Sequence, residues 1–323
     1  MTRAAADRAS VDGQVRLAAG RRVGYRIYGL SDGRPVYFFH GFPGSRLQAA
    51  LLHRQALAAG VALVAFDRPG FGLSDPAPAP TVDSIAGDVF ELADALGHRR
   101  LAVIGVSCGG PHALAAARLA PDRITAVGLL AGIGPMDRPE LRKGQLPLLR
   151  AMFALAGWQP WLISPLLALD RLMFRRNPER AVRALASMMT PPDRRLVEAS
   201  ADLRTAFGAS LAEAYRQGIG GALQEAGRIA RFGDAGLDGI PVPVHVFQSG
   251  QDHNVPPPMG RFMAGRLAGG SYHDCPEEGH LSIVVNRFDE CVRLLATGLL
   301  QVSPDGQHEL PSQALARGPS PGD

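Results

Sequence analysis

Five short apolar runs constrain the fold of this chain more than any other feature. Each ends in a turn rich in glycine or proline and shows no alternation of apolar and polar residues; the runs are residues 35–40, 61–67, 101–107, 124–132 and 243–250. Such runs are typical of strands buried on both faces of a parallel sheet. Residues 15–29 predict two further short strands joined by a glycine-containing turn.

The segments between these runs have the apolar spacing of helices. Residues 46–60, 81–97 and 111–121 fit this pattern, and two of them end at a glycine. Alternating strands and helices predict an α/β fold: a mostly parallel sheet with helices on both faces. A chain of 323 residues with 46% hydrophobic and 20% charged residues is too apolar to be disordered, and three cysteines are too few for a disulfide framework.

The alternation stops after Gly134 and resumes at Val242. Residues 135–232 contain no strand-like run and are interrupted by prolines, which predicts an all-helical insertion. We therefore expect a core of residues 15–134 and 233–301, an insertion of residues 135–232, and flexible tails at residues 1–14 and 302–323.

A glycine-flanked serine follows the third run. Gly105-Val106-Ser107-Cys108-Gly109 matches G-x-S-x-G after a buried strand and before a helix, the context in which a serine nucleophile occupies a tight turn. The alternative is a plain glycine-rich turn. The buried strand before the motif and the helix after it favour the interpretation of Ser107 as a nucleophile.

A serine hydroxyl needs a base and an acid that orients it. His280 is the last of the histidines expected in the ordered chain, as the order serine, acid, histidine requires. Asp252 follows the fifth run and is the predicted acid, with Asp137 and Asp274 as alternatives. The backbone N–H groups of Phe42 and Cys108 are the predicted oxyanion donors.

With those residues placed, the chain resembles the α/β-hydrolase family. The motifs that carry the resemblance occur in chain order at residues 40–46, 67–75, 105–110, 248–257 and 278–282. The resemblance implies an α/β-hydrolase fold with an eight-stranded, mostly parallel sheet and a helical cap at the insertion. It also implies hydrolysis of an ester, lactone or similar acyl bond of a small, partly apolar molecule, with no cofactor and no metal.

Several other functions use the same residues. They are C–C bond hydrolysis, perhydrolase or haloperoxidase chemistry, acyl transfer, and an aminopeptidase activity like that of proline iminopeptidases. The last is weakened because those enzymes usually carry Trp at the position of Cys108. Ser107 separates the chain from the epoxide hydrolases and haloalkane dehalogenases, which carry Asp there. A non-catalytic ligand-binding protein is a further alternative.

The charge of the chain is concentrated in the insertion. Residues 135–232 hold 15 basic and nine acidic residues, whereas the net charge of the whole chain is +4. No nucleic-acid-binding motif accompanies this excess, so we expect a small-molecule substrate and no nucleic-acid partner. A preference for anionic substrates, or for an anionic surface, is the hypothesis that the excess supports. The sequence predicts no oligomeric state.

Residues 151–169 form an uncharged apolar segment long enough to cross a membrane. Pro160 and Pro165 would break such a helix, so the segment predicts two short helices and no membrane span. The start of the chain lacks the apolar stretch of a signal peptide, which predicts a cytoplasmic protein. Large apolar residues of the insertion predict either an apolar substrate pocket or packing against the core; they are Met152, Phe153, Trp158, Trp161, Leu162, Met173 and Phe174.

Overall fold

The computed structural model describes residues 12–300, with side chains described as far as residue 296. Most of the two expected tails, residues 1–11 and 302–323, lies outside the described part. The first strand begins at Asp12, three residues before the expected start of the core.

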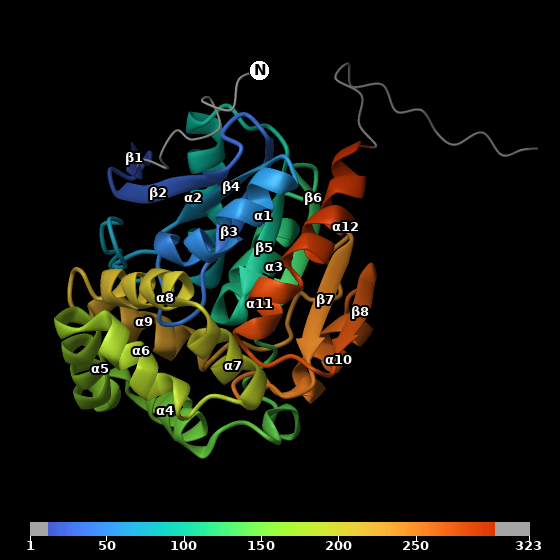
Figure 1. Ribbon diagram of the computed structural model, residues 1–323. Helices are drawn as coiled ribbons and strands as arrows, with labels where there is room; N and C mark the ends of the chain where they lie inside the picture. The colour runs from blue at the N-terminus through green and yellow to red at the C-terminus, as the bar shows by residue number, and fades with distance from the viewer. Residues whose placement is uncertain (1–11, 301–323) are drawn as a thin grey trace, which may run out of the picture.

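Eight strands form one sheet in the order β1-β2-β4-β3-β5-β6-β7-β8 (Figure 1). Strand β2 pairs antiparallel with β1 and β4, and all other neighbours are parallel. The strands are β1 (Asp12–Arg16), β2 (Arg22–Gly29), β3 (Arg34–Phe39), β4 (Val61–Phe66), β5 (Leu101–Val106), β6 (Ile124–Leu130), β7 (Val244–Ser249) and β8 (Gly270–Cys275). The predicted α/β fold with an eight-stranded, mostly parallel sheet is confirmed.

Strand β8 is the one core strand that no apolar run predicts. Its residues, Gly-Ser-Tyr-His-Asp-Cys, are mostly half-buried because β8 lies at the edge of the sheet and pairs only with β7. An edge strand needs no continuous apolar run, so the sequence pattern that reveals the central strands is missing here.

Two layers of helices cover the sheet. One face packs against α1 (His53–Ala58), α11 (Ser282–Asn286) and α12 (Phe288–Leu300). The other packs against α2 (Val82–Ala95), α3 (Gly110–Leu119) and α10 (Pro257–Arg266). The central strands β4, β5 and β6 are buried along their whole length. Full burial of each Val, Leu, Ile or Phe side chain stabilises the fold by about 1.5–3 kcal/mol.

Between β6 and β7 the ordered elements are all helical, and we call residues 135–232 the cap. They are η4 (Pro139–Arg142), α4 (Pro147–Trp158), η5 (Pro160–Ile163), α5 (Ser164–Arg176), α6 (Pro178–Ala186), α7 (Pro191–Ala199), α8 (Ala201–Ala214) and α9 (Gly220–Ile229). Several prolines stand in the first turn of a helix, where the missing N–H costs nothing. No helix of the described residues is long and apolar enough to cross a membrane.

The cap lies beyond the carboxyl ends of the parallel strands (Figure 1). Its helices α4 and α9 share a buried apolar cluster with Phe71, Cys108 and Ile133, which follow β4, β5 and β6. A second cluster joins α5 to α8 and includes Leu281, beside the predicted base. The cap is therefore packed directly over the loops that carry the candidate site.

Candidate active site

Ser107 occupies a sharp turn between β5 and α3. It begins the short helix η3 (Ser107–Gly109) with a φ of 51°, a conformation that a non-glycine residue adopts at a cost. The flanking glycines are required by close packing: a Cβ on Gly105 would lie 2.7 Å from the Gly110 Cα, and one on Gly109 would lie 2.2 Å from the Phe39 carbonyl oxygen. This is the geometry of a nucleophile elbow.

Asp252 and His280 lie together at the carboxyl end of β7. The Nδ1 of His280 is 2.7 Å from the Oδ2 of Asp252, and the aspartate side chain is fully buried. The other carboxylate oxygen accepts the backbone N–H groups of Asn254 and Val255 at 2.8 and 2.9 Å. These bonds fix the carboxylate, which in turn fixes the Nδ1–H tautomer of the imidazole.

The electrostatics of His280 favour its protonated form. Burial alone would lower the pKa of His280, but the carboxylates of Asp252 and Asp193 raise that pKa above the ordinary histidine value. A fifth of the imidazole side chain is exposed. A base of this kind loses activity as the pH falls through its raised pKa, because the protonated ring cannot accept another proton.

The structure joins the acid and the histidine by a hydrogen bond. Among the hydrogen bonds of the described residues, none joins the Ser107 hydroxyl to His280. Such bonds are often long in a free enzyme and shorten when substrate binds. The alternative acids are placed elsewhere: Asp274 contacts the Tyr272 hydroxyl at 3.4 Å, and Asp137 lies beside Gly233.

The loop after β3 approaches the serine at Gly41. A Cβ on Gly41 would lie 3.6 Å from the Ser107 Cβ. The Gly41 N–H donates to the Gln48 side chain at 2.7 Å, and Arg68 donates to the carbonyls of His40 and Gly41. No acceptor within the described chain takes the Phe42 N–H, so this donor is free to meet a ligand.

A residue that the sequence analysis missed holds the loop of His280. Asp193, on α7 of the cap, accepts three successive backbone N–H groups: those of His280 at 2.9 Å, Leu281 at 3.0 Å and Ser282 at 2.8 Å. Gly279 fits because it has no side chain, since a Cβ would lie 2.5 Å from the Asp193 carboxylate. The partners are 87 to 89 residues apart in the chain, and no local motif connects them.

A second missed contact joins the cap to the loop after β4 and to α3. Glu225, on α9, is fully buried and lies 3.0 Å from Arg68 and 3.2 Å from His112, and it also pairs with Arg228. Burial alone would raise the pKa of Glu225, but Arg68, Arg228 and His112 hold that pKa well below its usual range. Two carboxylates of the cap therefore contact the surroundings of the candidate site. Asp193 binds the loop of His280, and Glu225 binds Arg68, which donates to the Gly41 carbonyl.

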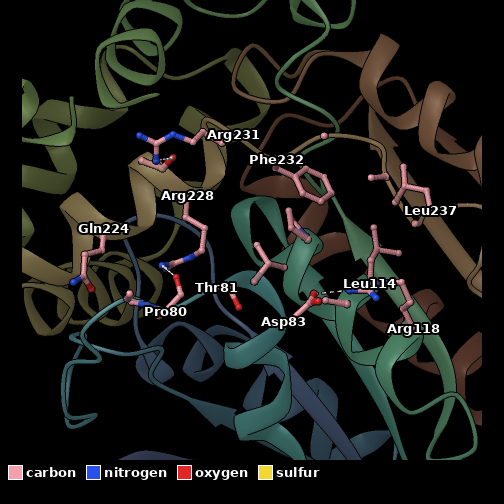
Figure 2. A pocket seen from close by; sticks show the side chains of 18 of the residues that line it. Pro80, Thr81, Asp83, Leu114, Arg118, Gln224, Arg228, Arg231, Phe232 and Leu237 are labelled. Carbon is pink, nitrogen blue, oxygen red and sulfur yellow. Dashed lines mark hydrogen bonds and ion pairs between the residues drawn. The ribbon is translucent and has the colours of Figure 1, made fainter. Parts of the chain in front are cut away.

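A cavity of about 570 Å³ lies away from this site, and Ser107, Asp252 and His280 are not part of its lining (Figure 2). Its walls come from the start of α2, one side of α3, and α9 with the segment after it. The three arginines around it already donate to protein oxygens: Arg118 to Asp83, Arg228 to the Pro80 carbonyl and Arg231 to the Gly227 carbonyl. The cavity thus offers no converging set of free polar groups that would mark it as a reaction site.

Comparison with known proteins agrees with this geometry. Residues 34–286 match the model of the alpha/beta hydrolase fold family, and the chain belongs to that family. Over 139 residues it is 34% identical to a non-heme chloroperoxidase of Streptomyces lividans, covering 42% of this chain and 50% of that protein. The chain spans about half the length of the curated relatives it matches.

Solved structures show the same fold. The bromoperoxidase from Bacillus anthracis superposes with a TM-score of 0.67 at 19% identity, covering 89% of this chain and 100% of that one. The enol-lactonase from Burkholderia xenovorans LB400 superposes with a TM-score of 0.59 at 23% identity, with the same coverage. Membership of the family confirms the predicted fold and the predicted class, a hydrolase enzyme.

Proposed function

We propose that this protein is a serine hydrolase that cleaves an ester, lactone or similar acyl bond of a small molecule. The observation that carries the proposal is the 2.7 Å contact between His280 and a buried, hydrogen-bonded Asp252, on the side of the sheet where Ser107 occupies its strained turn. That arrangement is the acid–base half of a serine hydrolase, with the nucleophile on a neighbouring loop.

The reaction would begin with attack of the Ser107 Oγ on the carbonyl carbon while the Nε2 of His280 takes the hydroxyl proton. Asp252 would stabilise the resulting imidazolium. The oxyanion would be bound by the N–H groups of Phe42 and Cys108, the second of which lies in the first turn of the helix that follows the serine. The leaving alcohol would take the proton from His280, and water would then release the acid from Ser107.

Asp193 has a positioning role in this proposal. Its three backbone contacts fix where the loop of His280 lies, and its charge adds to the raised pKa of the imidazole. A displacement of about 1 Å at a reacting group can cost on the order of 10²-fold in rate.

The test is the Ser107→Ala variant, assayed with p-nitrophenyl esters of graded acyl length and with lactones. Turnover is expected to fall on the order of 10⁶-fold, to background, while the fold is retained. A fluorophosphonate probe should label the wild type and the control variant Ser187→Ala, in which a cap surface serine is changed, but not Ser107→Ala. Substantial esterase activity in Ser107→Ala would overturn the proposal.

Perhydrolase chemistry is a second candidate, favoured by the 34% identity to a non-heme chloroperoxidase. Hydrogen peroxide would replace water as the group that releases the acyl chain, giving a peracid that oxidises halide. Halogenation of monochlorodimedone with acetate and peroxide measures this. Activity that disappears in Ser107→Ala would support it, and halogenation no faster than without enzyme would exclude it.

A further inference from the structure

Both tryptophans of the chain lie on the cap and are exposed. Trp158 ends α4 with 73% of its surface exposed, and Trp161 lies three residues later in η5 with 64% exposed. Further large apolar residues are exposed on α4 and on the next helix, α5, and we call the whole set the tryptophan face: Leu155, Trp158, Trp161, Leu166, Leu169, Leu172 and Met173. Core packing, one of the two alternatives from the sequence, is wrong for the two tryptophans, because most of the surface of each is exposed.

The same helices bury a different set of residues. Met152, Phe153 and Ala156 of α4, and Leu167 and Phe174 of α5, are the ones that pack inward. Both α4 and α5 therefore carry buried and exposed apolar residues, and packing among the described residues covers only the buried set. Seven large apolar side chains exposed on consecutive helices exceed the scattered single residues of an ordinary surface, and such a concentration normally marks an interaction site.

Most arginines of α4, α5 and the adjoining helix α6 have no acidic partner within the described chain. Residues 147–186 hold six arginines and two carboxylates, a net charge of +4 in a chain whose total is +4. Only Arg183 forms an ion pair among the described residues of this segment, with Glu179 at 3.5 Å. The other carboxylate, Asp170, is occupied by the Tyr215 hydroxyl. The exposed arginines that this leaves unpaired are Arg150, Arg171, Arg175, Arg176 and Arg180.

We infer that the tryptophan face binds the surface of a membrane containing anionic phospholipid. Tryptophan favours the boundary between headgroups and acyl chains, and helices that lie in that boundary pair an apolar face with arginine or lysine. The unpaired arginines supply the charge complementarity. A second copy of the chain fits less well, because a two-fold contact sets the same surface against itself and would bring these arginines together.

The inference is independent of the proposed hydrolase function. The tryptophan face consists of the exposed residues of α4, η5 and α5, whereas these helices contact the site through their buried residues and the cap carboxylates of the site lie on α7 and α9. Membrane binding can therefore be measured without any substrate, and its loss need not change the turnover of a soluble ester.

The two tryptophans make the test direct, because the intrinsic tryptophan emission of the protein comes from this face alone. Vesicles of phosphatidylcholine with a quarter phosphatidylglycerol are compared with vesicles of phosphatidylcholine. We expect co-sedimentation and a blue shift of the emission with the anionic vesicles, both weakened by salt.

Two double variants separate the apolar and the charged contributions to vesicle binding. Trp158→Ser with Trp161→Ser should abolish co-sedimentation. Arg175→Gln with Arg176→Gln should weaken binding about 10- to 30-fold. The control is Arg99→Gln with Arg100→Gln, an adjacent exposed pair on the core, which should bind as the wild type does.

Two results would overturn the inference. One is the absence of co-sedimentation with the anionic vesicles at low salt. The other is a blue shift that grows with protein concentration in the absence of vesicles, together with a dimer in sedimentation equilibrium, which would assign the tryptophan face to a second copy.

Discussion

The charged residues on the two sides of the cap differ in whether they have partners. On the side that meets the core, Asp193, Glu213 and Glu225 are engaged by the loop of His280, by Arg46 and by Arg68. On the outer side, the arginines of α4, α5 and α6 have no acidic partner among the described residues, except Arg183, which pairs with Glu179. A third of the acidic residues of the cap therefore contact the core, where they do not offset the charge of the outer arginines.

The largest expected effect is a loss of stability from a substitution on the side of the cap that meets the core. Replacing Glu225 by Gln removes the negative charge between Arg68, His112 and Arg228, and leaves Arg68 buried with only carbonyl partners. We expect the free energy of unfolding to fall by about 3–5 kcal/mol, measured by urea denaturation. The matched control is Glu198→Gln, an exposed cap carboxylate, which should leave that free energy unchanged. Equal stability of the two variants would contradict the difference between the two sides.

The next effect concerns catalysis rather than stability. Asp193→Asn keeps the size of the side chain but presents an amide where the backbone N–H of His280 now donates to a carboxylate. We expect kcat/KM for a p-nitrophenyl ester to fall roughly 10- to 100-fold. The variant lacks one of the charges that raise the pKa of His280, so the acid limb of the pH profile of kcat/KM should move to lower pH.

The pH profile distinguishes positioning from a general loss of structure. A merely structural defect would lower kcat/KM without moving the acid limb. If Asp193→Asn kept the wild-type rate and pH profile, the contact of Asp193 with the loop of His280 would have no role in positioning the imidazole. Glu198→Gln, on the same helix, serves again as the control.

The smallest expected effect is the change in stability from a substitution on the outer side of the cap. Arg183 and Glu179 form an exposed pair one helical turn apart, and such pairs contribute little because water and salt screen them. Arg183→Ala should change the free energy of unfolding by less than about 0.5 kcal/mol in the same urea experiment. A loss comparable to that of Glu225→Gln would mean that the outer arginines stabilise the fold.

Much of the fold follows from local pattern. The runs that became β3 to β7 are mostly apolar, and the glycines and prolines that end them act within a few residues. The prediction that Ser107, Asp252 and His280 act together rests on chain order, and the structure places Asp252 against His280. It remains a prediction that the three form one catalytic unit.

The sequence by itself determined the α/β order, the position of the helical insertion and the candidate residues, because periodicity and turn chemistry are local properties of a chain. Only the tertiary structure decided which carboxylates of the cap are buried against the core and which apolar residues face outward. Glu225 meets His112 across 113 residues, and Asp193 meets His280 across 87. Contacts over such separations depend on how helices pack, and packing left the two tryptophans and their arginines on the outside.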